Sequence, residues 1–177
     1  MYLDACKNLY NTSKPFFKNT RVALDVGSKF GAYAYFMCMD FEVIHCFDMR
    51  NRMRWKQLNR NKIQFHNVAL GAKNGTVKFT GAHTTAAGNK EATLVKLDSM
   101  ALTNVDHIKI DVEGDELAVL TGAESTINTY KPVITIEQNL SEEKLNKGKK
   151  FEALQWLESR GYTVKAIVDN DYILTQN

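Results

Sequence analysis

A short loop with two glycines follows the apolar segment 22–26, in which the acidic Asp25 is embedded. The loop begins Gly27-Ser28-Lys29 and leads through Gly31 into a helix-like segment. Where such a loop joins a strand to a helix in an open α/β sheet, free amide groups at the start of the helix face a crevice that binds polar or anionic ligands. Lys29 replaces the middle glycine of a dinucleotide fingerprint, so that fingerprint is not matched. The loop predicts a ligand site; the alternative is an ordinary glycine-containing connection.

An acidic residue also ends the next apolar segment. Asp48 comes directly after residues 43–47. A carboxylate at the tip of the second strand is suited to accept the hydrogens of both ribose hydroxyls. The same residue could instead cap the helix that is predicted to follow it. Together with the glycine loop, Asp48 indicates a cofactor that contains adenosine.

A third group of acids follows the apolar segment that begins at His107. Asp111 falls at the carboxyl end of the predicted strand, the edge that lines ligand crevices in such sheets. Crowded carboxylates have raised and coupled pKa values, which suits Asp111 to proton abstraction or to metal ligation, with Glu137 as the second candidate base. The neighbouring acids 113, 115 and 116 could simply complement a helix dipole. The rival bases His66, His83 and His107 rank lower, and no residue is assigned to a metal site.

Apolar segments of strand length alternate with helix-like segments, which predicts an α/β fold with a doubly wound, mostly parallel, seven-stranded sheet. Five strands are predicted at Arg21–Val26, Glu42–Phe47, Lys62–Val68, His107–Val112 and Pro132–Glu137. Helices are predicted at Phe30–Met39, Asn51–Arg60, Glu116–Thr126 and Lys149–Arg160. A terminal hairpin formed by residues 162–168 and 172–175 then places a reversed strand near the C-terminal edge.

Two regions fall outside this alternation. Residues 1–20 form a leader ahead of the domain predicted at 21–177. Residues Gly71–Asp98 interrupt the alternation with a short strand, Thr76–Thr80, and a loop of small residues, His83–Asn89. That loop predicts either a mobile functional element or a surface excursion without a role.

The composition restricts the compartment and the partners. A chain of 177 residues with 44% hydrophobic residues can bury a core that needs neither disulfides nor a metal. Its three cysteines form no CxxC pair, and no signal peptide or membrane span is apparent, so we expect a cytoplasmic protein without membrane attachment. The net charge of +3 does not by itself indicate nucleic acid. Basic residues nevertheless cluster in segments 50–62 and 144–150, either as a nucleic-acid surface or as solvated helix faces.

Several segments resemble the signature blocks of the FkbM family of S-adenosylmethionine-dependent methyltransferases. They are Leu24-Asp25-Val26-Gly27, Val68-Ala69-Leu70-Gly71, residues 108–114, Glu116-Leu117, Val119-Leu120, Gly122-Ala123, residues 131–134 and Ile136-Glu137. The Ile-Lys-Ile-Asp-Val-Glu-Gly block at 108–114 is the most specific. The resemblance implies the Rossmann-like class I methyltransferase fold, S-adenosyl-L-methionine as cofactor, and methyl transfer to a hydroxyl of a sugar, glycan or other metabolite.

The resemblance also implies which residues bind the cofactor: Asp25, Gly27, Ser28, Lys29 and Gly31 around the loop, Asp48 and Met49 at the ribose, Ala69 and Leu70 at the adenine, and Asp111. Ser28-Lys29 and Asp48-Met49 depart from the family's usual Ala-Asn and Glu-Pro. Lys29 could meet the methionyl carboxylate or hinder the sulfonium.

Two alternatives to a small-molecule or glycan acceptor stay open. One is a nucleic-acid methyltransferase that uses the basic segment, and the other is a cofactor-binding or interaction module without catalysis. Little of the chain is left to cover the site, so we expect an open site for a large acceptor or a pocket completed by a second subunit of a homo-oligomer.

Overall fold

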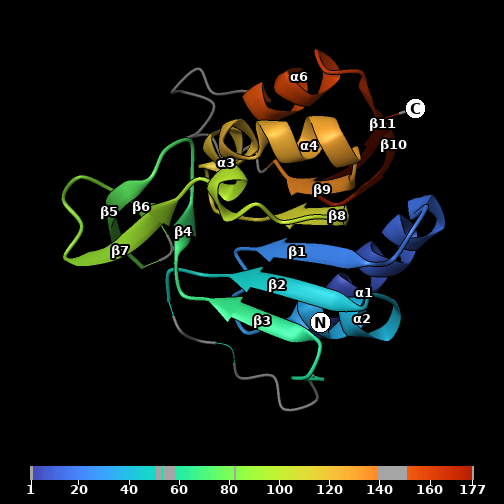
Figure 1. The fold of residues 1–177 in the computed structure, drawn as a ribbon, viewed down its shortest axis with the longest axis horizontal. Coiled ribbons are helices and arrows are strands. Elements are labelled where there is room, and N and C mark those ends of the chain that lie inside the picture. Colours follow the sequence, from blue (N-terminus) through green and yellow to red (C-terminus); the bar gives the residue numbers. More distant parts are fainter. Residues whose placement is uncertain (1, 51–52, 54–58, 82, 139–150, 177) are drawn as a thin grey trace.

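The computed structural model describes residues 2–50, 53, 59–81, 83–138 and 151–176. Its main sheet has seven strands in the order β10-β11-β9-β8-β1-β2-β3 (Figure 1). Their bounds are β1 Val22–Val26, β2 Val43–Phe47, β3 Ile63–His66, β8 Val105–Ile110, β9 Val133–Glu137, β10 Tyr162–Val168 and β11 Asp171–Gln176. All pairs are parallel except the two made by β11. The predicted doubly wound sheet with one reversed strand near its edge is therefore confirmed.

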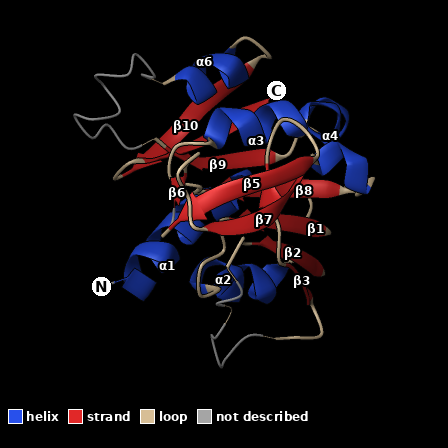
Figure 2. Ribbon diagram, turned by 90° about the vertical axis from the view of Figure 1, so that its left-hand side faces the viewer, coloured by secondary structure: helices blue, strands red, loops and turns tan. Residues whose placement is uncertain are grey.

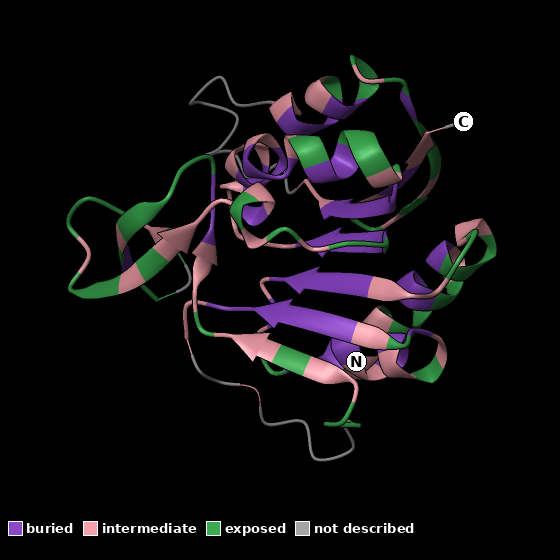
Figure 3. Ribbon diagram, in the orientation of Figure 1, coloured by how far each residue is buried: buried purple, intermediate pink, exposed green. Residues whose placement is uncertain are grey.

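Helices cover both faces of this sheet (Figures 1 and 2). The helices α1 (Tyr2–Ser13) and α2 (Ala32–Asp40) pack on one face, and α3 (Glu116–Gly122), α4 (Glu124–Tyr130) and α6 (Glu152–Glu158) pack on the other. Short 3-10 turns lie at Lys14–Phe16 and Leu97–Met100. Because both faces are covered, the central strands are buried along nearly their whole length (Figure 3).

The two faces have separate hydrophobic cores because side chains alternate along each strand. In β1, Leu24 and Val26 belong to the core under α3, α4 and α6, whereas Ala23 belongs to the core under α1 and α2. By the same alternation, Asp25 and its neighbour Lys109 on β8 lie on the α1 and α2 face. The fold thus places charged groups on one face of buried strands, at the end where a site is expected.

The amino-terminal leader contains α1. Leu9 and Tyr10 are buried against α2, and the Ser13 hydroxyl lies 3.1 Å from the Thr135 hydroxyl on β9. The leader is therefore packed on the sheet, while the predicted division of the chain at residue 20 stays a prediction.

Segment 71–98 forms most of a second, four-stranded sheet, of which the sequence predicted only one strand. Its order is β4 (Ala69–Leu70), β7 (Lys90–Val95), β5 (Gly75–Thr80) and β6 (His83–Thr84). Figure 1 shows this sheet beside the carboxyl ends of the parallel strands. The predicted loop 83–89 thus begins as a strand, because its first residues pair with the end of β5.

The helix predicted at 116–126 is two helices separated at Ala123. Two observations explain the break. A Cβ atom at Gly122 would lie 2.0 Å from the Gly71 carbonyl oxygen, so α3 ends in close contact with the backbone after β4. The Asp98 carboxylate then accepts the amide hydrogens of Ser125 and Thr126, which starts α4. The helix predicted at 51–60 falls almost entirely outside the described residues, as does segment 144–150.

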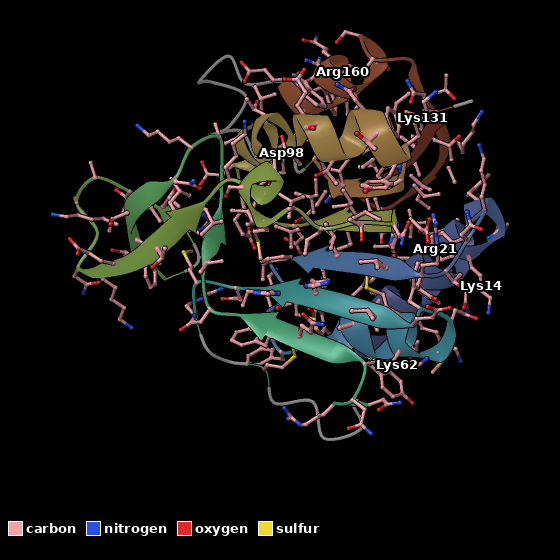
Figure 4. All side chains as sticks on the ribbon, viewed as in Figure 1. Lys14, Arg21, Lys62, Asp98, Lys131 and Arg160 are labelled. Carbon is pink, nitrogen blue, oxygen red and sulfur yellow. The ribbon has the colours of Figure 1, made fainter. Side chains whose placement is uncertain are left out.

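Ion pairs and side-chain hydrogen bonds join elements far apart in the sequence, several of them at residues labelled in Figure 4. Arg21 binds Asp106 through its backbone amide and its guanidinium, and the Lys62 ammonium donates to the carbonyls of Cys38 and Phe41.

The cysteines at 6, 38 and 46 are free thiols. Among the described residues, no helix has the length and apolar character that a membrane span requires.

Asp98→Ala is expected to lower the free energy of unfolding by about 1–2 kcal/mol, since α4 loses its amino-terminal hydrogen-bond acceptor. Urea denaturation measures this change. Asp98→Asn retains one acceptor oxygen and serves as the matched control, which should lose less stability. Equal stability of the alanine variant and the unchanged protein would contradict this role for Asp98.

Candidate active site

Two adjoining pockets lie at the carboxyl ends of β1, β2 and β8. The first, here called the cofactor pocket, is lined by seven of the predicted residues: Gly27, Lys29, Asp48, Met49, Ala69, Leu70 and Asp111. The second, here called the acidic cavity, has a volume of about 180 Å³ and is lined by Asp25, Ser28 and Glu137 as well as residues of α1 and the β10–β11 turn. Gly27, Lys29 and Asp111 line both pockets. Gly31 lines neither and instead precedes α2 with φ of 89°.

The glycine loop is shaped by the close approach of β1 to β8. Gly27 has φ of +82°, and a Cβ atom there would lie 1.8 Å from the Asp111 carbonyl oxygen. The Asp111 amide in turn donates to the carbonyl of Val26 at 2.9 Å. Only glycine meets both requirements, which is why the strand ends can line one pocket together.

Asp48 is held from two sides. Its carboxylate accepts the backbone amide of Lys29 at 2.9 Å and that of Arg50 at 2.7 Å. These bonds tie the glycine loop to the end of β2. Each carboxylate oxygen can accept a further hydrogen bond, so Asp48 can act as a cap of the following turn and still bind a diol in the pocket.

The lining fits the cofactor that the resemblance implies. The apolar walls come from side chains of β1, β2 and the segment after β3, namely Val26, Phe47, Val68 and Leu70, and suit a flat base. Asp48 supplies the acceptor for a ribose. The Ser28 hydroxyl oxygen is buried and has no hydrogen-bond partner among the described residues, so it is available to form a hydrogen bond with a polar group of a ligand.

A row of polar side chains crosses the sheet on the α1 and α2 face. The strand register places Asp25 beside Lys109 and Lys109 beside Thr135. Lys109 is buried, and its ammonium lies 2.8 Å from the Asp111 carboxylate and 5.8 Å from the centre of the Tyr33 ring. Burial alone would lower the pKa of Lys109, but the charges of Asp111 and Asp25 raise it well above its usual value.

Asp111 and Glu137 form a coupled carboxyl pair. Burial alone would raise the pKa of Asp111, but Lys109, a hydrogen bond with Glu137, and Lys29 lower it far below its usual value. Lys29 also binds Glu113, and each contact is 3.2 Å. Burial, together with Asp111, raises the pKa of Glu137 to about 8. The pair therefore offers one firmly ionised carboxylate and one carboxyl that can exchange a proton near neutral pH.

The second sheet closes one side of the cofactor pocket. The Thr84 hydroxyl donates to Asp115, and the Arg50 guanidinium donates to the Gly81 carbonyl at 2.9 Å. His83 lies at this rim, 3.4 Å from the Glu113 carbonyl. Part of the predicted loop 83–89 is thus in contact with the site, and the acids at 113 and 115 line the pocket as well as preceding α3.

The other two candidate histidine bases, His107 and His66, are held by packing and hydrogen bonds within the main sheet. His107 is fully buried and hydrogen-bonds the Val133 carbonyl at 2.9 Å, and burial lowers its pKa to about 4. His66 stacks on Phe47 and hydrogen-bonds His45 at 2.9 Å. Within the described part of the chain, no group of three or more potential ligand side chains is arranged to hold a metal ion.

Lys109, Asp171 and helix α1 line the acidic cavity but are not among the predicted site residues. The burial of Lys109 could have been predicted from the sequence, because a lysine between two isoleucines in a strand covered on both faces must be buried and needs a carboxylate partner. Asp111, two residues later, lies on the same face. Residue 171 lies between the two predicted hairpin strands, and nothing local shows that this turn reaches the end of β9.

Comparisons with known proteins agree with this geometry. A family model described as the methyltransferase FkbM domain matches residues 25–164. The chain belongs to the FkbM methyltransferase family. The resemblance seen in the sequence is confirmed, and membership identifies an S-adenosylmethionine-dependent methyltransferase domain. No curated protein matches the sequence significantly.

Solved structures share the fold of this FkbM-family chain. Methyltransferase FkbM from Methylobacillus flagellatus KT matches with a TM-score of 0.60 and 18% identity over 88% of this chain, which spans 43% of that protein. Precorrin-8w decarboxylase from Methanobacterium thermoautotrophicum matches with a TM-score of 0.58 and 14% identity over 97% of this chain and 88% of the other. N-methyltransferase NodS from Bradyrhizobium japonicum WM9, in complex with S-adenosyl-L-homocysteine, matches with a TM-score of 0.53 and 12% identity over 97% and 84%.

Proposed function

We propose that this FkbM-family chain transfers the methyl group of S-adenosylmethionine to a hydroxyl of a sugar, glycan or other metabolite. The observation that carries the proposal is the boundary shared by the two pockets. Gly27, Lys29 and Asp111 line both, so a donor in the cofactor pocket lies next to the acidic cavity, where an acceptor can bind. Asp48 and Met49 would hold the ribose, Ala69 and Leu70 the adenine, and the loop with Asp25 and Ser28 the methionyl end.

The protein's own task is alignment and proton removal. When bound, S-adenosylmethionine supplies an electrophilic methyl group, and in-line displacement needs an oriented acceptor shielded from water. Packed strand ends hold the residues on both sides of the shared boundary. They thereby fix the direction from which an acceptor approaches.

Glu137 is better suited than Asp111 to take the proton of the hydroxyl. Asp111 is held ionised by Lys109 and Lys29, so its affinity for a proton is low. Glu137 has a raised pKa and lines the acidic cavity. In this proposal Asp111 anchors the two lysines and orients Glu137, which acts as the general base.

We also propose an acceptor class, a cellular location and an oligomeric state. The basic segments that motivated a nucleic-acid acceptor lie largely outside the described residues. The described cavity is acidic, which disfavours a phosphate-rich acceptor. A cytoplasmic location and a second subunit that completes the site are also proposed.

Incubation of the purified protein with methyl-labelled S-adenosylmethionine and a fractionated cell extract tests the function. We expect label to appear in a small molecule or glycan, in a bond that resists mild acid and base as an ether does. The Glu137→Gln variant is the background control. Binding of the cofactor without transfer of label to any fraction would favour the non-catalytic alternative, and label in RNA or DNA would favour the nucleic-acid alternative.

A further inference from the structure

The acidic cavity has an excess of negative charge. Among the described residues that line it, five carry carboxyl groups and two are lysines, a formal charge of −3. The carboxyl groups belong to Asp25, Asp111, Glu137, Asp169 and Asp171. Both lysines, Lys29 and Lys109, are bound to Asp111.

None of the remaining four carboxyl groups of the lining forms a close ion pair within the described structure. Asp25, Glu137, Asp169 and Asp171 make no ion pair within 4.0 Å there. Clustered carboxyl groups without cations are unfavourable in a partly buried cavity unless they stay protonated or bind a positive ligand.

Asp25 is an independent sign that a ligand is needed. Asp25 is 1% exposed and lines the cavity. Neither of its carboxylate oxygens accepts a hydrogen bond of normal geometry from a described residue. Burial raises its pKa to about 6, although Lys109 and the backbone amide of Ala34 act in the opposite direction. A fully buried carboxylate whose oxygens accept no hydrogen bond of normal geometry is uncommon in folded proteins and indicates a group that binds there.

The methyl donor does not neutralise this lining. Its sulfonium, ammonium and carboxylate groups carry a net charge of +1. Its ammonium can meet Asp25 beside the glycine loop. That leaves the exposed Asp169 and the half-buried Asp171, which come from the β10–β11 hairpin and line the cavity together with α1 residues such as Tyr2 and Cys6.

We propose that the acceptor carries an ammonium group near the hydroxyl that is methylated, and that Asp171 and Asp169 bind this group. The inference rests on the proposed function, because it assigns the acidic cavity to the acceptor. The register places Asp171 directly opposite Glu137, so an ammonium held by Asp171 brings a nearby hydroxyl to the general base. The acceptor class is therefore an amino sugar or another amino alcohol rather than a neutral sugar.

Binding of paired probes tests the charge preference directly. The protein is first saturated with S-adenosyl-L-homocysteine, which already supplies the ammonium of the donor, and is then titrated with glucosamine or glucose while NMR shifts are followed. We expect glucosamine to bind at least about tenfold more tightly than glucose. Asp171→Asn should reduce this ratio to about threefold or less. Glu91→Gln, which removes one charge from an exposed position on β7, should leave it unchanged.

Equal binding of the two sugars, no detectable binding of either sugar, or an unchanged ratio in Asp171→Asn would overturn the inference. The asparagine is nearly isosteric and should fold, which a thermal melt verifies. Failure to bind S-adenosyl-L-homocysteine would instead count against the proposed function itself. The two failures are therefore distinguishable.

The labelled product from the extract gives a second test. We expect it to be retained on a cation-exchange resin at neutral pH, with the label on oxygen. Acetylation of the amines in the extract beforehand should lower the incorporation of label at least about tenfold. A labelled product that passes through the resin would overturn the inference while supporting the proposed methyltransferase. Label on nitrogen would support the ammonium-binding cavity but contradict O-methylation.

Discussion

Glu137→Gln is expected to lower kcat for methyl transfer by about 10²–10⁴-fold, the usual contribution of a general base. The substitution preserves the size of the side chain and its ability to hydrogen-bond Asp111, but it removes proton acceptance. Affinity for S-adenosyl-L-homocysteine should change less than about threefold, because the methionyl end is proposed to bind at Asp25 and Ser28 and not at Glu137. Single-turnover kinetics with the labelled donor measure the effect.

Two comparisons separate this role from a loss of structure. Glu91→Gln removes the same charge from an exposed strand and should retain full activity. Asp111→Asn should also reduce turnover, but it leaves the buried Lys109 without its closest carboxylate and should lower stability as well. Retention of more than about a tenth of kcat in Glu137→Gln would exclude Glu137 as the base.

The pH dependence of the reaction follows from the same pair. The pKa of Glu137 is raised to about 8, and the active form of a general base is the deprotonated one. We therefore expect kcat/KM for the acceptor to increase with pH up to this region and then to level off. A profile that is flat between pH 6 and about 9 would contradict the assignment.

Gly27→Ala is expected to weaken binding of S-adenosyl-L-homocysteine by at least about 100-fold or to prevent folding, since its Cβ atom would lie 1.8 Å from the Asp111 carbonyl oxygen. The glycine loop would have to move away from β8, and the boundary between the two pockets would change. Calorimetric titration and a thermal melt measure the two outcomes.

Gly81→Ala is the matched control for backbone strain. Gly81 has φ of +62°, but a Cβ atom there meets nothing within 4 Å. Its cost should be the strain of a positive φ alone, about 1 kcal/mol. If the two alanine variants behave alike, close contact with Asp111 is not what requires glycine at position 27.

Much of the fold could be predicted because buried parallel strands have a simple sequence pattern. The segments around Leu24, Ile44, Ile108 and Ile134 are mostly apolar runs of strand length, and their ends place Asp48 and Asp111 at one edge. The second sheet was mostly missed because its strands are short and partly exposed, and they pair with one another rather than with the main core.

Apart from Glu137, the lining of the proposed acceptor cavity was mostly not predicted, because it is assembled from remote parts of the chain. Tyr2 on α1, Glu137 on β9 and Asp171 on β11 meet only through the sheet order and the packing of α1. The different roles proposed for Asp111 and Glu137 likewise depend on the buried Lys109, and only the structure shows how close its ammonium lies to Asp111.

Calorimetric titration of S-adenosyl-L-homocysteine into the protein and into Asp48→Ala tests the central claim most directly. Asp48 directly follows β2, lines the cofactor pocket and is expected to accept hydrogen bonds from the ribose hydroxyls. We expect saturable binding with one site per chain and a loss of about 10–100-fold in affinity in Asp48→Ala, with Glu91→Gln unchanged. No binding at millimolar ligand, or equal binding by Asp48→Ala, would contradict it.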